Sequence, residues 1–496
     1  MVDTQPEPAA VAETHISVVV FVGDRAYKLK KPVSFGFLDF STRELREQAC
    51  HREVALNRRL APDVYEGVAD VTGPDGRPWD HLVVMRRLPA DRRLSTLVTT
   101  GVDVADHLRE LARLVAAFHA AADRSPEIDD AATPASVSDW WTRNLGEMRR
   151  FAGSLLPQPA FEEVQQLARR YVAGRRHLFE RRIEHGAVVD GHGDLLADDV
   201  FCLDDGPRAI DCIEFDDRLR HNDVLADVAF LAMDLERLGA PALAGEFLAA
   251  YREFAGETWP DSLVHHYLAQ RAVVRAKVTA LRVDQGDADA ADLARRFLEL
   301  AHEHLAAGRV RLVLVGGLPG TGKSTLSGAL SDAAGWVLLR SDEVRKDAAG
   351  IGHEQSAAAG YLEGLYSHTH TVATYNELLE RARTALELGE SVVLDASWTD
   401  ARERSAAAAL ADDVAADLVA LRCDAPRELA AERVDARARR GGDASDASAA
   451  VAAAMAADAD PWPAATVVDT TGTPDEALSA ALDAVGPTAR GAHRPS

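Results

Sequence analysis

Cysteine is scarce in this chain of 496 residues, and long apolar runs are missing. The four cysteines include no CxxC pair and no metal-site spacing, which argues against a fold built on disulfides or zinc and favours buried free thiols in a reducing compartment. No stretch approaches the roughly 18 uninterrupted apolar residues that cross a membrane. Residues 1–12 lack the basic start and apolar core of a signal peptide. The sequence therefore predicts a cytoplasmic protein without membrane partners.

Positive charge is also in short supply. The chain has 55 Lys and Arg against 79 Asp and Glu, so its net charge is −24. An acidic chain repels polyanions at long range, which argues against an extended nucleic-acid partner, although a local basic pocket can still hold a phosphate. Aromatic residues make up only 6%, but hydrophobic residues reach 47%, enough to bury globular cores.

The length exceeds what one core supports, because domains run roughly 100–200 residues. Apolar runs at 15–23 and 26–30 flank a Gly-Asp turn and predict a β-hairpin. Helical spacing dominates from 41 to 60 and from 102 to 305, interrupted by short strands within 187–215. We expect a disordered tail at 1–12, followed by a first domain at 13–305 with a small β-rich lobe and a mostly helical lobe.

The second half has a different pattern. Apolar strand-like runs alternate there with helical segments, which predicts a parallel sheet joined by crossover helices. These runs lie at 311–315, 336–339, 391–394, 418–422 and 466–469. The sequence therefore predicts a separate α/β domain at 306–496.

A phosphate-binding motif follows the first of these strands. Residues 317–324 read GLPGTGKS and match GxxxxGK[ST] between a strand and a helix, the context that supports such a motif. Backbone N–H groups would wrap the phosphates of ATP, Lys323 would bridge the β- and γ-phosphates, and Ser324 would ligate Mg²⁺. Asp395, at the end of the strand at 391–394, is expected near the same ion. The expected nucleotide-binding residues are Gly317, Gly320, Thr321, Gly322, Lys323, Ser324 and Thr325.

The segment SDEVRK at 341–346 adds an acceptor side to this motif. It resembles a motif of small P-loop kinases in the polynucleotide kinase and zeta-toxin group. The resemblance implies that Asp342 accepts the proton of the attacking hydroxyl and that Arg345 binds the acceptor. Arg433 and Arg437, one helical turn apart, resemble lid arginines that clamp the transferring phosphoryl group. A solvated helix face is the competing interpretation of that pair.

The first half carries a second set of polar motifs. His192-Gly193-Asp194 follows a short strand, with Asp199 five residues after Asp194, and Asp211 ends a later strand. This pattern resembles the aminoglycoside phosphotransferase branch of the protein-kinase-like fold, whose loop reads HGDxxxxN. The resemblance implies that Asp194 is the catalytic base and that Asp199 and Asp211 hold Mg²⁺. Asp199 replaces the expected Asn and adds negative charge to the site.

The small lobe completes this pattern. Ala26-Tyr27-Lys28 resembles the A-x-K of a kinase strand, which implies that Lys28 binds the α- and β-phosphates and that Glu53 pairs with it. Lys30 and Lys31 remain alternatives to Lys28. His119 and Asp227 fall at recurrent family positions and are expected to be structural.

The segment KLKKPVSFGFLDFS at 28–41 looks like that of a particular branch of this fold. Nearly the whole chain resembles bacterial fusions of an aminoglycoside phosphotransferase-like domain with a P-loop kinase. The resemblance implies a bifunctional phosphotransferase that uses ATP and Mg²⁺, with small-molecule hydroxyl acceptors. Two alternatives stay open. The first domain can be a pseudokinase that regulates a single active P-loop kinase, as the Asp199 substitution suggests. Asp342 and Arg345 also fit a kinase of nucleic-acid 5′-hydroxyl ends, which the net charge opposes.

Overall fold

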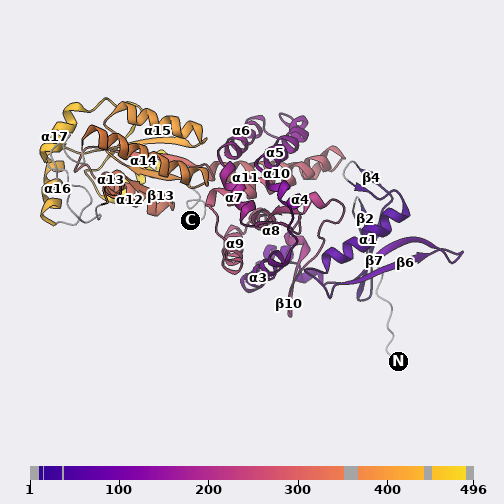
Figure 1. Ribbon diagram of the computed structural model, residues 1–496. Helices are drawn as coiled ribbons and strands as arrows, with labels where there is room; N and C mark the ends of the chain where they lie inside the picture. Colours follow the sequence, from indigo (N-terminus) through magenta and orange to yellow (C-terminus); the bar gives the residue numbers. More distant parts are fainter. Residues whose placement is uncertain (1–9, 15, 36–37, 351–366, 441–448, 488–496) are drawn as a thin grey trace. The chain divides into compact units, whose positions relative to one another are not determined.

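The computed structural model describes residues 10–14, 16–35, 38–350, 367–440 and 449–487 (Figure 1). Contacts divide the chain into two compact units: residues 1–140, 181–258 and 267–300 form unit 1, and residues 141–180, 259–266 and 301–496 form unit 2. No helix in the described ranges is long and apolar enough to span a membrane. All four cysteines are free and buried, which confirms that part of the prediction.

Unit 1 begins with a five-stranded antiparallel sheet in the order β1-β2-β3-β7-β6. The turn between β2 and β3 has two residues, and Gly23 takes a φ of +57°, as a tight hairpin requires. Helix α1 contacts β7 and β6 of this sheet and is capped by Thr42, whose side chain accepts from the Leu45 N–H. The bounds are β1 Ala10–Glu13, β2 Ser17–Val22, β3 Arg25–Lys30, β4 Ser34–Phe35, β5 Leu38–Asp39, α1 Arg43–Asn57, β6 Tyr65–Thr72 and β7 Pro78–Arg86.

Strand β1 differs from the sequence prediction. Residues 10–12, assigned above to a disordered tail, pair with β2 in antiparallel register, with Ala10 opposite Phe21. All four β1 side chains are exposed, so backbone hydrogen bonds and not apolar burial order this segment. Composition alone does not reveal such a strand.

The rest of unit 1 is mostly helical, with two short hairpins that carry the polar motifs. Strand β9 pairs with β10, and β8 pairs with β11, both antiparallel. The bounds are α2 Leu94–Thr99, α3 Ala105–Ala121, α4 Pro126–Asp129, β8 Val188–Asp190, β9 Val200–Leu203, β10 Gly206–Ala209, β11 His221–Asp223, α8 Val224–Arg237 and α9 Pro241–Ala255. The unit boundary falls inside α5 Pro134–Met148, α7 Arg176–Glu184, α10 Asp261–Asp284 and α11 Ala291–Ala307.

Unit 2 contains the predicted parallel sheet, in the order β13-β14-β12-β15-β16. Every residue of the central strand β12 is buried, as expected for a strand covered on both faces. All five predicted strands are present, within one or two residues of their predicted ends. The bounds are α6 Gln158–Gly174, β12 Arg311–Gly316, α12 Lys323–Ala334, β13 Val337–Arg340, α13 Ser341–Ala348, α14 His368–Glu387, β14 Val392–Asp395, α15 Ala401–Asp413, β15 Asp417–Asp424, α16 Arg427–Arg440, α17 Ala449–Asp458, β16 Thr466–Asp469 and α18 Pro474–Val485.

Candidate active sites

Lys28 of β3 joins two carboxylates that are far apart in sequence. Its Nζ lies 2.9 Å from Glu53 Oε1 of α1 and 2.6 Å from Asp211 Oδ1. Burial alone lowers the pKa of Lys28, but the charges of Asp211 and Glu53 outweigh burial and raise that pKa well above its usual value. The ammonium is therefore held charged beside Asp211. The structure brings together the Lys, helix Glu and later Asp that the sequence singled out.

The alternatives to Lys28 occupy different places. Lys30 is only 1% exposed and pairs with Glu53 Oε2 at 2.7 Å and with Glu214. Lys31 pairs with Glu13, whose side chain is 66% exposed. Lys28 is thus the lysine of the three that contacts Asp211. No sequence motif singles out Glu214, and its position between the apolar residues Ile213 and Phe215 is the one signal of a buried charge there.

Replacing Lys30 with methionine is expected to destabilise unit 1 strongly. The change leaves the buried Glu53 and Glu214 carboxylates without their shared cation, and breaking a buried ion pair costs about 3–5 kcal/mol. Lys31→Met is the matched control, because a surface pair contributes about 0–1 kcal/mol. Chemical denaturation measures the free energy of unfolding of both variants. Equal unfolding free energies for the two variants would contradict this assignment.

The loop that carries Asp194 is held by Asp227 of α8. The two Asp227 oxygens accept from the His192 and Gly193 backbone N–H groups, each at 2.8 Å. His119 Nε2 lies 3.0 Å from Asp227 Oδ2, and Asp227 is fully buried. Despite burial, hydrogen bonds and charge from His119 hold the pKa of Asp227 far below its usual value. The structure thus gives His119 and Asp227 the structural place that the sequence reading expected.

Three carboxyl groups, those of Asp194, Asp199 and Asp211, act on one another here. Burial raises the pKa of Asp194 to about 6, with Arg275 opposing and Asp211 reinforcing the shift. Burial, Asp211 and Asp194 raise the pKa of Asp199 well above its usual value. Lys28 lowers the pKa of Asp211. Within the described residues, no three acidic, His or Cys side chains form a preassembled metal cluster.

Asp211 differs in one respect from its prediction. Strand β10 ends at Ala209, so Asp211 lies in the following loop, where its φ is +66°. A non-glycine residue with positive φ is uncommon and costs about 1–3 kcal/mol. The backbone N–H of Asp211 donates to the Tyr65 hydroxyl at 3.2 Å, and that of Cys212 donates to Asn57 Oδ1 at 2.9 Å. Side chains from the small lobe therefore maintain this conformation, which sequence periodicity does not report.

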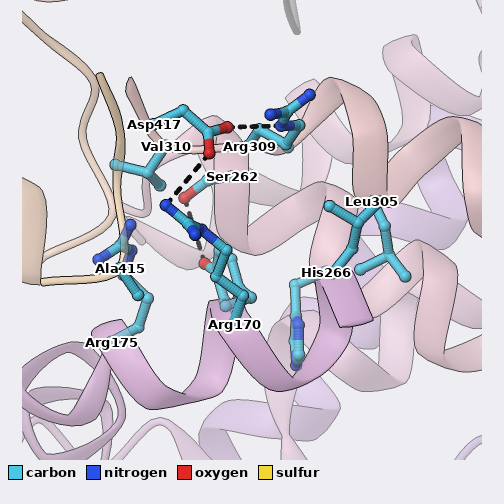
Figure 2. A pocket seen from close by; sticks show the side chains of 12 residues that line it. Arg170, Arg175, Ser262, His266, Leu305, Arg309, Val310, Ala415 and Asp417 are labelled. Carbon is cyan, nitrogen blue, oxygen red and sulfur yellow. Dashed lines mark hydrogen bonds and ion pairs between the residues drawn. The ribbon is translucent and has the colours of Figure 1, made fainter. Parts of the chain in front are cut away.

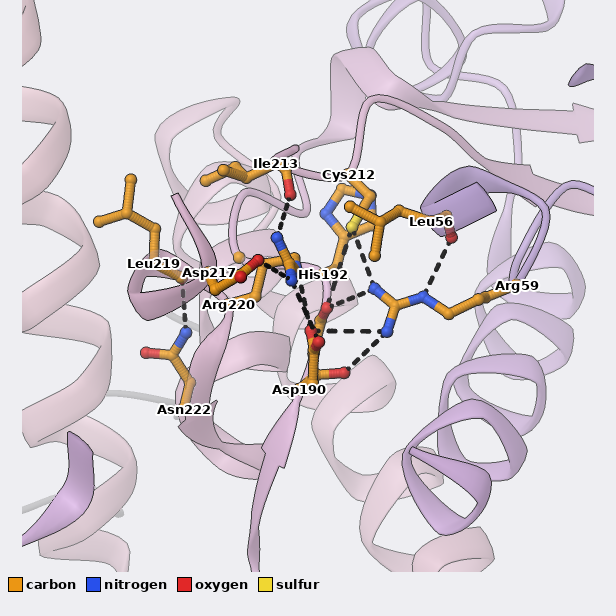
Figure 3. Close-up of polar contacts among 12 residues, drawn as sticks. Leu56, Arg59, Asp190, His192, Cys212, Ile213, Asp217, Leu219, Arg220 and Asn222 are labelled. Carbon is orange, nitrogen blue, oxygen red and sulfur yellow. Dashed lines mark hydrogen bonds and ion pairs between the residues drawn. The ribbon is translucent and has the colours of Figure 1, made fainter. Parts of the chain in front are cut away.

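Two arginines that the sequence reading missed surround Asp190, just before the loop (Figure 3). Arg220 binds both Asp190 oxygens at 2.7 and 3.1 Å and donates to the Ile213 carbonyl at 2.7 Å. Arg59, just beyond α1, donates to the carbonyls of Asp190 and Gly191 at 3.1 and 3.0 Å. These bonds tie the helix that carries Glu53 to the loop that carries Asp194.

In unit 2 the phosphate-binding motif lies between β12 and α12, as predicted. Gly322 precedes α12 with a φ of +86°, and the Thr321 hydroxyl donates to the Leu318 carbonyl at 2.8 Å. The Thr470 hydroxyl, after β16, donates to the Thr321 carbonyl at 2.7 Å. Lys323 begins α12, so the motif presents a helix N-terminus, an environment that suits phosphate. Ser324 and Thr325 follow as exposed residues of its first turn.

Gly320 also packs closely against helix α16. A Cβ at this position would lie 2.2 Å from the Ala430 carbonyl oxygen, and the φ of Gly320 is +83°. Gly320→Ala is therefore expected to displace the loop, to lower the free energy of unfolding of unit 2 by about 1–3 kcal/mol and to weaken ATP binding.

Calorimetric titration with ATP and thermal unfolding measure both effects. Gly328→Ala in α12 is the control, because its added Cβ would meet only Arg340 Nη2 at 3.6 Å, and alanine suits a helix interior better than glycine. Unchanged ATP affinity in Gly320→Ala would contradict this packing argument.

Asp395 ends β14 directly beside the phosphate-binding motif, opposite Val315 of β12. It is 4% exposed, and its Oδ1 has no hydrogen-bond partner among the described residues. Burial raises its pKa, while Lys323 and a hydrogen bond from Ser324 oppose the shift and Asp342 adds to it. A buried, unpartnered carboxylate oxygen beside Ser324 fits a divalent cation.

The acceptor-side residues lie at the end of the next strand. Asp342 and Arg345 occupy the first two turns of α13, where Arg345 Nη1 lies 2.8 Å from Asp342 Oδ1. Arg340, which ends β13, lies 3.9 Å from Asp395. Asp342 also acts on the Asp395 carboxyl, so the residues assigned to the acceptor and to the metal share one edge of the sheet.

Of the two predicted lid arginines, the structure describes the side chain of Arg433 only. Arg433 donates to the Thr470 carbonyl at 2.8 Å, and its Nη1 would lie 3.7 Å from a Cβ on Gly322. It therefore lies beside the phosphate-binding motif. Arg437 follows on α16, but its side chain lies outside the described part of the structure.

Tyr375 and Trp398, which no sequence motif singles out, pack edge to face with ring centres 5.1 Å apart. The Tyr375 hydroxyl lies 3.2 Å from Ser397 Oγ and accepts from the Trp398 N–H at 3.2 Å. Trp398 has a φ of +53° and is buried. Burial and Asp400 raise the pKa of the nearby Glu403 to about 7, against a Tyr375 hydrogen bond and the charge of Arg345.

Unit 2 also has a cavity at the opposite ends of its strands, before β12 and β15 (Figure 2). Asp417 lies there between Arg170, at 3.3 Å, and Arg309, at 2.5 Å. Arg175 donates to the Val414 carbonyl at 2.8 Å. These contacts fasten α6 to the loop before β15, away from the phosphate-binding motif.

Comparison with protein families agrees with this geometry. Residues 19–263 match the model of the phosphotransferase enzyme family, and residues 312–462 match a model described as an AAA domain. Two nucleotide-dependent modules of these kinds define an ATP-dependent phosphotransferase.

Relatives that match nearly the whole chain identify the family to which it belongs. Rv2004c of Mycobacterium tuberculosis H37Rv, described as an uncharacterized protein, is 44% identical over 462 residues, which covers 93% of this chain and 92% of the relative. Mb2027c of Mycobacterium bovis matches equally. The chain belongs to the family of these mycobacterial proteins.

Solved structures are also similar to parts of the chain. A choline/ethanolamine kinase family protein from Mesorhizobium loti is 17% identical, with a TM-score of 0.37, over 60% of this chain and 91% of its own. A gluconokinase from Sinorhizobium meliloti is 18% identical, with a TM-score of 0.25, over 35% and 91%.

Proposed function

We propose that the chain is a bifunctional phosphotransferase that moves the γ-phosphate of ATP to two different hydroxyl acceptors, most simply small molecules. The observation that supports this best is that each unit assembles its own set of charged groups. Lys28 bridges Glu53 and Asp211 in unit 1, and Lys323, Ser324 and Asp395 meet in unit 2.

In the first site, Lys28 would bind the α- and β-phosphates, with Glu53 holding it in place. Asp194 would orient the acceptor hydroxyl and take its proton, and Asp199 and Asp211 would ligate Mg²⁺. Mg²⁺ uses one or two carboxylates together with phosphate oxygens and waters, so this function does not need a preassembled cluster. When bound, Mg²⁺ would neutralise and orient the phosphate oxygens.

Asp199 in place of Asn is compatible with this function. A carboxylate oxygen can ligate Mg²⁺ as an amide oxygen does, although burial, Asp211 and Asp194 raise the pKa of Asp199. A regulatory first domain is the second candidate, since the extra acid can instead weaken metal binding. Nucleotide binding by the Lys323→Ala chain, without transfer to any acceptor, would favour that alternative.

In the second site, the glycines, Thr321 and Thr325 would hold the phosphates through the loop and the helix N-terminus, and Lys323 would contact the β- and γ-phosphates. Ser324 and Asp395 would hold Mg²⁺. Asp342 would accept the proton of the acceptor hydroxyl, Arg345 would bind the acceptor, and Arg433 and Arg437 would contact the transferring group. The 2.8 Å pair between Arg345 and Asp342 supports this proposal, because it holds the Asp342 carboxyl in a fixed orientation.

Both sites would run the same balanced reaction. The acceptor oxygen forms a bond to the γ-phosphorus, the bond from that phosphorus to the β,γ-bridging oxygen breaks, and ADP leaves. The acceptor proton passes to Asp194 or Asp342. A screen for labelled phosphate transfer over sugars, nucleosides, aminoglycosides and 5′-hydroxyl oligonucleotides tests the proposal. Labelled oligonucleotide would instead favour a nucleic-acid end kinase.

A further inference from the structure

Two arginines of α10 have no assigned role. Arg271 and Arg275 are four residues apart and lie on one helix face. Arg271 is 5% exposed, its Nε donates to the Ala226 carbonyl at 2.8 Å, and its guanidinium lies 4.8 Å from the centre of the Phe230 ring. These contacts fix Arg271 against α8.

Ala226, whose carbonyl accepts from Arg271, is adjacent to a residue that holds the loop of the first site. Ala226 precedes Asp227, whose carboxylate holds the backbone of His192 and Gly193, next to Asp194. Arg275 and Arg271 are also the two cations whose charges act most strongly on the Asp194 carboxyl. The pair therefore lies close enough to Asp194 for its charge to act on the group that would receive the acceptor proton.

Each of the two arginines has a nitrogen donor that makes no hydrogen bond to the described residues. Arg271 Nη2 and Arg275 Nε are buried and have no hydrogen-bond partner among the described residues. Further along the same helix, Arg282 places Nε and Nη2 on Asp287 at 3.1 and 2.6 Å. A buried donor without a partner costs about 1–3 kcal/mol, and an anion at this position would offset that cost.

We propose that the acceptor of the first site carries an anionic group, a carboxylate or a phosphate ester, which Arg275 binds together with Arg271. This inference rests on the proposed function of that site. The acidic chain attracts cations at long range, but charges beyond about 8 Å are screened at physiological salt. Groups near Asp194 decide the specificity. Two arginines there, whose buried Nη2 and Nε donors have no hydrogen-bond partner among the described residues, favour an anion and repel an amine.

The test uses full-length protein with Lys323→Ala, which silences the second site. Transfer of labelled phosphate from ATP is measured for polyols that differ in charge: gluconate, sorbitol and glucamine, and glycerate, glycerol and 3-amino-1,2-propanediol. Glucose 6-phosphate against glucose separates phosphate esters from carboxylates. We expect the anionic member of at least one set to have the highest kcat/KM.

Arg275→Gln in the same background is expected to lower kcat/KM for that anion roughly 10- to 100-fold, as loss of a hydrogen bond to a charged group does. Transfer to the neutral member is expected to change less than about threefold. Arg282→Gln is the matched control and leaves every value unchanged. Arg275→Lys is expected to restore part of the loss, because it keeps the charge but not the guanidinium fork.

Preference for the neutral or amine member would overturn the inference while leaving the transferase function intact. An equal loss for all members in Arg275→Gln would do the same, because it would indicate a purely structural arginine. Absence of Asp194-dependent transfer to every compound would overturn the proposed function. In that case, calorimetric titration with gluconate and glucose 6-phosphate decides the anion site separately, and binding that ignores Arg275 would refute it.

Discussion

Replacing Lys323 with alanine is expected to abolish transfer at the second site and to reduce the nucleotides bound per chain from two to one. Lys323 begins the helix after the phosphate-binding loop and lies beside Asp395. Removing a positioned charge from a transferring phosphoryl group costs about 100- to 1000-fold in rate, by analogy with loss of one oxyanion-stabilising donor. Calorimetric titration gives the stoichiometry, and the transfer screen gives the rate.

Arg402→Ala is the control for this prediction. Arg402 lies on α15 of the same unit, its side chain is 88% exposed, and its nearest carboxylate, Asp400, is 4.0 Å away. It is expected to leave binding and transfer unchanged. A Lys323→Ala chain that still binds two nucleotides with wild-type affinity would show that the loop is not a nucleotide site.

Replacing Asp194 with asparagine is expected to abolish transfer at the first site only. A positioned general base contributes about 100- to 10,000-fold, and asparagine keeps the shape of the side chain without its basicity. The variant should fold, because the loop is held through the backbone N–H groups of His192 and Gly193. Asp204→Asn, at a 97% exposed side chain after β9, is the control.

The same carboxyl predicts a pH dependence. The pKa of Asp194 is raised to about 6, so the group is protonated and unable to accept a proton below that pH. First-site kcat/KM is therefore expected to rise as pH increases through about 6 and then to level off. Asp194→Asn should remove this limb. A profile that is flat from pH 5 to 8 would argue against Asp194 as the base.

Much of the fold could be predicted from the sequence because its signals are local. The apolar run of β12 and the glycines after it require only neighbouring residues, and so does the alternation of strands and helices in unit 2. Strand β1 could not be predicted, because exposed residues such as Ala10 and Val11 are ordered by pairing with β2 and not by burial.

The candidate sites were predicted as motifs but not as networks. Asp194, Asp211 and Lys28 stand in recognisable patterns, whereas Arg59, Glu214 and Arg220 act through contacts between segments more than 100 residues apart or through carbonyl groups. No periodicity encodes such contacts. Choosing Lys28 over Lys30 also requires the structure, because the two lysines are two residues apart on one strand, share one face, and both contact Glu53.

The most direct test of two separate phosphotransfer sites is the labelled-phosphate screen on wild type, Lys323→Ala and Asp194→Asn in parallel. The account predicts that each variant loses a different activity and keeps the other, and that the double variant loses both. An Asp194→Asn chain that retains every ATP-dependent activity of the wild type would contradict it.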